Sequence, residues 1–166
     1  DLDKIVLGED EWQHPLPRSC LLCELSDEER LRGLFLESGM AELIEENFVP
    51  RDRRGRKLLA GLFTVEHKSA PDRLIIDRRP QNATERRLTW AELPHRLGYV
   101  RPDEDLSASG FDLKNIFYDL RNPESWRKRI AFGRVFTGAE AKSPGGDPTK
   151  RYHMALRVWA MGDLNS

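Results

Sequence analysis

Apolar positions in the first third of the chain recur at helical spacing. The string "SDEERLRGLFLESG" places leucines and a phenylalanine three and four residues apart, which is typical of one helix face. Ser26 followed three residues later by Glu29 is typical of a capping box, and Gly39 is typical of a helix end. We therefore predict a helix over about residues 27–38, followed by a shorter helical piece in "MAELIEEN".

Later segments alternate or are continuously apolar, as strands are. "LLAGLFTVEHK" and "DRLIIDRR", separated by "SAP", predict a hairpin of two strands. "RKRIAFGRVF" and "RYHMALRVWAM" predict two more strands, joined by a connection rich in glycine and proline. "SASGFDL" is a further strand candidate.

The remaining segments predict short helices and loops. A short helix is expected to start near Thr84, and a helical turn to include Phe117 and Tyr118. Residues 51–57 are predicted to form a loop. Together these elements predict an α+β fold, in which antiparallel strands are flanked by helices. We divide the chain into an irregular N-terminal arm (1–25) and two further regions, 26–105 and 106–166.

Length and charge narrow the choice of function. The 166 residues suffice for one hydrophobic core. Residues 1–50 carry 13 acidic and 4 basic residues, whereas residues 51–166 carry 15 acidic and 23 basic ones. The basic part is rich in arginine, whose paired donors suit the phosphates of nucleic acid or polyphosphate. An ordinary solvated surface is the alternative.

Other features of the sequence predict neither a membrane span nor a secretion signal. No stretch of 18 apolar residues occurs, and the acidic N-terminus lacks a methionine, so we expect a fragment without a membrane span or signal peptide. Cys20 and Cys23 form a lone CxxC pair. A zinc site would need two more ligands, of which only His14 is near, and incidental reduced thiols are the alternative.

One carboxylate stands out in "GFDLKNIFYDLRNP". Asp112 follows a predicted strand and precedes a turn and two adjacent aromatic residues, Phe117 and Tyr118. A carboxylate at such a position can hold a divalent cation, and the amides of the turn can bind a triphosphate. Alternatively, Asp112 is only a turn residue.

Three separated strings together resemble motifs of retroelement reverse transcriptases. "DLKNIFYDLRNP" resembles the first palm motif, "RLIIDRRPQN" the fingers motif, and "LRVWAMGDLN" the start of the second palm motif. They occur in the order of the family. The resemblance covers about residues 39–166 and implies that residues 26–105 are fingers-like and that residues 106–166 form part of a palm with an incomplete sheet.

The resemblance implies template-directed DNA synthesis by nucleotidyl transfer, assisted by two Mg²⁺ ions. Asp112 would be the catalytic, metal-binding carboxylate, and Leu113 would bind metal or nucleotide through its backbone. Phe117 would lie under the ribose of the nucleotide. The implied partners are an RNA or DNA template–primer and a dNTP.

The fingers motif and the second palm motif imply further binding residues. Arg73 and Lys68 would contact the triphosphate, and Gly162 would let the backbone approach the nascent base pair. The three residues expected to contact the template or fix the fingers are Asp77, Arg79 and Asn82. Singly, each motif has a structural alternative: Arg73 and Asp77 as cross-strand charge partners, Phe117 as a core aromatic, and Gly162 as a turn glycine.

One departure from the family limits the expected activity. The second catalytic motif, which contains two consecutive aspartates, does not occur in this chain. We therefore expect the isolated chain to be inactive as a polymerase and only marginally stable, because the missing hairpin would leave a palm strand edge unpaired. The alternatives are a non-catalytic nucleic-acid-binding module and a protein-interaction domain that uses the acidic first quarter. Localisation, nuclear or cytoplasmic, and oligomeric state stay open.

Overall fold

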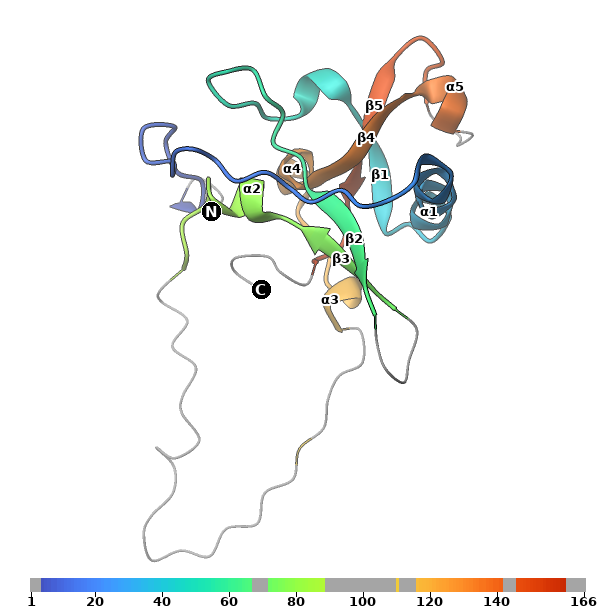
Figure 1. Cartoon of the computed structure of the whole chain (residues 1–166), viewed down its shortest axis with the longest axis horizontal. Helices are drawn as coiled ribbons and strands as arrows, with labels where there is room; N and C mark the ends of the chain where they lie inside the picture. Colours follow the sequence, from blue (N-terminus) through green and yellow to red (C-terminus); the bar gives the residue numbers. More distant parts are fainter. Residues whose placement is uncertain (1–3, 67–71, 89–109, 111–115, 142–145, 161–166) are drawn as a thin grey trace, which may run out of the picture.

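The computed structural model describes residues 4–66, 72–88, 110, 116–141 and 146–160. In these ranges the chain forms two small antiparallel sheets with flanking helices (Figure 1). The predicted α+β class is confirmed. Asp112, Leu113, Lys68 and Gly162 lie outside the described residues, as does the strand candidate "SASGFDL" apart from Gly110.

The larger sheet has three strands in the order β1 (Ala41–Glu45), β5 (Arg151–Leu156) and β4 (Ala131–Thr137). β5 lies in the middle and pairs antiparallel with both neighbours. β4 and β5 are the two strands predicted near the C-terminus. β1 falls in the predicted fingers-like region and β5 in the predicted palm region, so the two regions share one sheet.

The helical piece expected in "MAELIEEN" is wrong. Ala41 to Glu45 form β1, and only Glu46 to Phe48 form a single 3₁₀ turn, η2. Every residue of β1 has a partner on β5, from Ala41 opposite Leu156 to Glu45 opposite Tyr152. This long-range pairing outweighs the local helix propensity of the segment.

The smaller sheet is the predicted hairpin, formed by β2 (Gly61–Val65) and β3 (Arg73–Asp77). The short helix α2 (Arg79–Asn82) follows β3 directly. The N-terminal arm crosses beside the hairpin, where the Leu22 N–H donates to the Leu62 carbonyl at 2.9 Å (Figure 1).

Gly61 permits this close crossing. A Cβ atom at position 61 would lie 1.8 Å from the carbonyl oxygen of Cys20. Only glycine lets two backbone segments come this near to each other. The arm therefore depends on one residue of β2 for its path.

The main helix, α1 (Leu25–Glu37), matches the predicted helix but begins two residues earlier. The expected Ser26 capping box is wrong, because Glu24 is the N-cap residue and makes no side-chain capping bond. The helix ends at Gly39 as predicted, with φ +67° and its N–H bonded to the Leu36 carbonyl at 3.1 Å.

The other described helices are single turns: α3 (Ile116–Asp119), α4 (Glu124–Arg127), η4 (Lys128–Ile130) and α5 (Gly138–Ala141). α3 confirms the helical turn predicted at Phe117. The helix expected to start near Thr84 is wrong over 84–88, where Thr84 is a turn residue and Glu85 bridges to Val6 of the arm. No described helix could cross a membrane.

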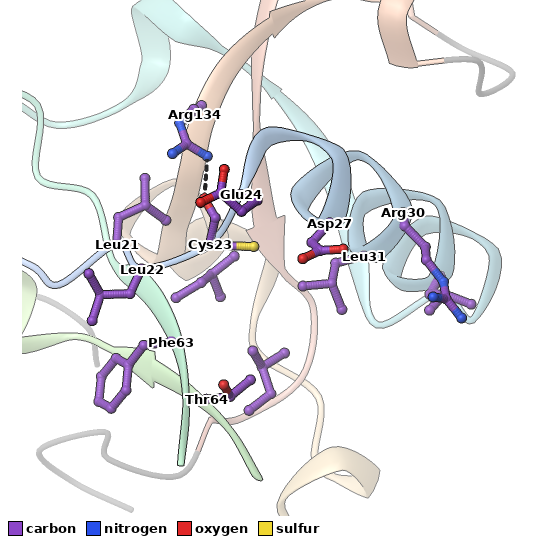
Figure 2. Close-up of a pocket in the computed structure, with 13 residues that line it drawn as sticks. Leu21, Leu22, Cys23, Glu24, Asp27, Arg30, Leu31, Phe63, Thr64 and Arg134 are labelled. Atoms are coloured by element: carbon purple, nitrogen blue, oxygen red, sulfur yellow. Dashed lines mark hydrogen bonds between the residues drawn. The ribbon is translucent and has the colours of Figure 1, made fainter. Parts of the chain in front are cut away.

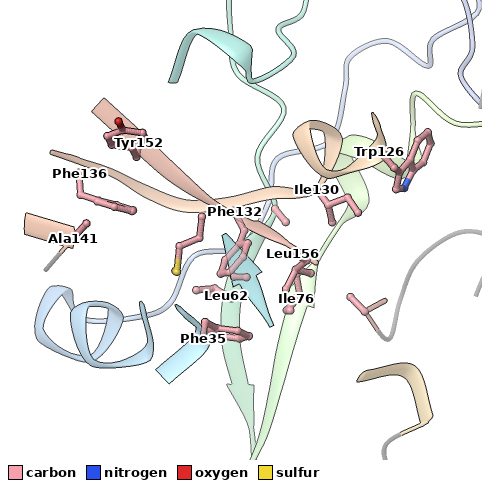
Figure 3. Close-up of a cluster of buried hydrophobic side chains, with 14 residues drawn as sticks. Phe35, Leu62, Ile76, Trp126, Ile130, Phe132, Phe136, Ala141, Tyr152 and Leu156 are labelled. Atoms are coloured by element: carbon pink, nitrogen blue, oxygen red, sulfur yellow. The ribbon is translucent and has the colours of Figure 1, made fainter. Parts of the chain in front are cut away.

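One hydrophobic core joins both sheets and α1 (Figure 3). Phe35 of α1 stacks edge-on against Phe132 of β4, with ring centroids 5.4 Å apart. The backbone of Ala60, just before β2, bonds to Ala131 at 2.9 Å and thereby ties the hairpin to the larger sheet. Trp126 is also buried in this core.

Candidate nucleic-acid interface

Arg73 is the first residue of β3 and lies at the end of the hairpin that is farther from the core. It pairs with Val65 in the register and is exposed, as Val65 is. Asp77 lies at the other end of the same strand, opposite Gly61. The alternative that Arg73 and Asp77 are cross-strand partners is therefore wrong, and Arg73 presents its guanidinium to solvent.

Asp77 is the anchor of the turn that follows β3. Its carboxylate accepts two bonds from the Arg79 guanidinium, at 2.8 and 2.7 Å, and one from the Cys20 N–H at 2.7 Å. The Arg79 bond lowers the pKa of Asp77 against the opposing effect of burial, and the Cys20 bond lowers it further. The Asp77 side chain is 5% exposed and that of Arg79 is 62% exposed, so Asp77 positions an arginine that faces solvent.

A buried ion pair joins Arg78, the residue before α2, to Glu85, which follows α2. The side chains of Arg78 and Glu85 have no exposed surface, and Arg78 Nη2 lies 2.9 Å from Glu85 Oε1. Burial lowers the pKa of Arg78, while the Glu85 charge acts to raise it. Gln81 donates from Nε2 to the carbonyls of Leu58 and Ala131, each at 3.2 Å. Charged and amide side chains usually lie on the surface. The sequence patterns therefore did not indicate that Arg78, Gln81 and Glu85 are buried.

Two of the template-binding candidates meet in one hollow between the arm and α2. This α2 hollow, of about 470 Å³, is lined by Gln13, Pro17, Arg79, Asn82, Ala83, Glu85 and Arg87. Arg79 and Asn82 thus line one surface, and Asp77 is buried beneath it. Arg73 lies apart at the start of β3, and Phe117 is half-buried in α3.

Metal ligands are not gathered in the part of the chain that the structure describes. No group of three or more His, Cys, Asp or Glu side chains there could hold a metal ion. Cys20 and Cys23 are free thiols, and burial, together with Glu28, raises the pKa of Cys23.

His153 forms a buried polar cluster outside the predicted motifs. It lies on the central strand β5 and is 1% exposed. Its Nδ1 donates to the Gly133 carbonyl, and its Nε2 accepts from Lys57 Nζ, both at 3.1 Å. Burial, followed by the Lys57 charge, lowers the pKa of His153 to about 4, so the ring is neutral at pH 7.

A second, more apolar groove lies between the arm, α1 and the hairpin (Figure 2). It measures about 710 Å³, and its lining includes Leu22, Leu34 and Phe63. Arg134 reaches its rim and donates to the Cys23 carbonyl at 2.9 Å (Figure 2). Leu22 and Leu34 are 75% and 54% exposed, so this groove offers mainly hydrophobic contact.

Comparison with known proteins adds no family. No protein-family model matches this chain, and no curated protein matches it. The likeness to reverse transcriptases therefore rests on the three sequence strings.

Proposed function

We propose that this chain is the fingers and the first part of the palm of a retroelement reverse transcriptase. The longer enzyme would extend a DNA primer on an RNA or DNA template, with two Mg²⁺ ions assisting nucleotidyl transfer. Asp112 and Leu113 would bind metal, and Lys68, Arg73, Phe117 and Gly162 would contact the nucleotide.

The observation that carries the proposal is the placement of "RLIIDRRPQN" on a hairpin and its turn. Arg73 begins β3 with an exposed guanidinium, while Asp77 ends it and holds Arg79 beside Asn82. A nucleotide-binding arginine at the outer part of a hairpin and a template-binding pair at its base suit the fingers of a polymerase. In this proposal the motif forms two surfaces: Arg73 contacts the nucleotide, and Arg79 and Asn82 contact the template.

The nucleotide sequence after codon 166 tests the polymerase proposal without a biochemical assay. In the transcript, the frame after residue 166 should encode an aromatic residue, any residue and two aspartates within a few dozen codons. A stop codon at this point would favour the second candidate, a non-catalytic nucleic-acid-binding module.

The module has its own support in the exposed arginines of the α2 hollow. If the chain is only such a module, its affinity for nucleic acid should fall steeply with salt and ignore Asp112→Ala. Mg²⁺-dependent binding of a dNTP that is lost in Asp112→Ala would instead support the polymerase.

A further inference from the structure

The loop over residues 51–57 is held in one shape by Asp52. Its carboxylate accepts the N–H groups of Arg54 and Arg56, at 3.0 and 2.8 Å, and pairs with the Arg56 guanidinium at 3.1 Å. Gly55 adopts φ +77° and donates its N–H to the Asp52 carbonyl at 2.8 Å. The backbone that carries four arginines is therefore ordered by its own hydrogen bonds.

The arm forms a fixed wall beside this loop. Trp12 and Leu16 are buried with Leu58 in a small hydrophobic cluster. Arg56 also donates from Nη2 to the Leu16 carbonyl at 3.3 Å. These contacts hold the arm against the loop at the side of the molecule away from α1 (Figure 1).

Between the loop and the arm lies a hollow of about 700 Å³, the arginine hollow. Its lining residues are His14, Pro15, Leu16, Arg18, Asp52, Arg53, Arg54 and Arg56. Four arginines thus face a single carboxylate in one concave surface. The electrostatic potential there favours an anion.

Two of these arginines have spare donors. Arg56 is committed to Asp52, whose pKa stays below its ordinary value because the bonds from Arg56 and Arg54 outweigh the opposing effect of burial. Arg53 pairs with Glu9 at 3.2 Å, but both side chains are half or more exposed, and such pairs are weak. Within the described ranges, no ion pair or hydrogen bond engages the side chains of Arg18 and Arg54.

The arm forms a wall of both the arginine hollow and the α2 hollow. His14, Leu16 and Arg18 line the first, and Gln13 and Pro17 line the second. A single phosphate would occupy only part of one hollow, whereas a chain of phosphates that crosses the arm would reach both. Guanidinium groups match phosphate oxygens with paired donors.

We propose that the arginine hollow binds the sugar–phosphate backbone of a single-stranded nucleic acid that also passes over Arg79 and Asn82. This site deepens the proposed function, because Arg79 and Asn82 are its template-binding candidates. It adds Arg18 and Arg54 as backbone contacts on a surface that the three polymerase-like strings do not include. Contacts of this kind bind without reading the base sequence.

The test uses the wild-type chain and fluorescent single-stranded oligonucleotides, with anisotropy measured over a range of salt concentrations. Replacing both Arg18 and Arg54 by Gln should weaken binding about tenfold near 0.1 M salt and lower the log–log salt slope by about 1.4, or 0.7 per contact. Arg30→Gln is the matched control, since Arg30 is an exposed arginine on α1 and should leave binding unchanged. The double Lys variant should recover most of the affinity.

Two outcomes would overturn the site. One is a double Gln variant that keeps its circular dichroism spectrum and binds like the wild type. The other is displacement of the oligonucleotide by a free nucleoside triphosphate at equal phosphate concentration, which would indicate a discrete phosphate pocket. The site and the polymerase proposal fail separately, because this binding is measured with the 166-residue chain, without Mg²⁺, dNTP or nucleotide incorporation.

Discussion

Asp77 shows how one carboxylate can organise a surface without facing it. It ties the arm to the hairpin through the Cys20 N–H and holds the Arg79 guanidinium by two bonds. Hydrogen bonds to an ionised group contribute more than neutral ones. The side chain that meets a ligand and the side chain that positions it are thus different residues of the same motif.

Asp77→Asn should therefore destabilise the fold by about 1–2 kcal/mol at pH 7. Asp119→Asn, at an exposed position of α3, is the control and should change little. The folded pKa of Asp77 is lowered, so its contribution is present above about pH 4, the unfolded value, and is lost as pH falls through the folded pKa. Urea unfolding should show the gap between wild type and Asp77→Asn closing in acid; a gap that is absent at pH 7 would contradict this role.

His153 predicts a second pH effect, in a higher range. Because its folded pKa is about 4 and the unfolded value is about 6.5, the unfolded chain binds a proton first as pH falls. Stability should drop by roughly 3 kcal/mol between pH 6.5 and pH 4. In His153→Gln this drop should shrink, whereas His14→Gln, at an exposed position, should keep it. Equal pH slopes in wild type and His153→Gln would refute the assignment.

At the scale of elements, helices and hairpins that depend on local contacts can be predicted from local sequence patterns. The hairpin β2–β3 and the helix α1 follow from alternation and helical spacing, and both are found. β1 was mistaken for a helix because "MAELIEEN" suits one locally, while its strand state depends on pairing with β5 more than 100 residues later. The Arg78–Glu85 pair was missed for the same reason, since burial of charges depends on the tertiary fold.

Gly61 lies at a contact between two elements that leaves no room for a side chain. Gly61→Ala would drive a methyl group into the Cys20 carbonyl, so the arm must move from β2. We expect a loss of about 3 kcal/mol in the free energy of unfolding. The same change at Gly33 of α1, where a Cβ has open space, should stabilise by about 0.5–1 kcal/mol. Chemical denaturation of both variants measures the contrast; a neutral Gly61→Ala would show that the arm crosses elsewhere.

At the scale of the molecule, the described parts of both sheets, α1 and the arm pack around a main core, and the arginine hollow and the α2 hollow lie beside the arm. Charge asymmetry along the sequence predicted a basic surface in the second part of the chain. It did not predict that the arm, from the acidic part, would supply Arg18 and a wall of that surface. Such a site forms only when segments distant in sequence pack together.

The most direct test of the proposed polymerase is primer extension by a chain that also carries the second carboxylate motif. With a template–primer, dNTPs and Mg²⁺, we predict template-dependent incorporation that is abolished by Asp112→Ala and kept by Asp119→Ala. The 166-residue chain alone should give no product. Incorporation by that chain alone, or an extended chain whose activity survives Asp112→Ala, would contradict the account.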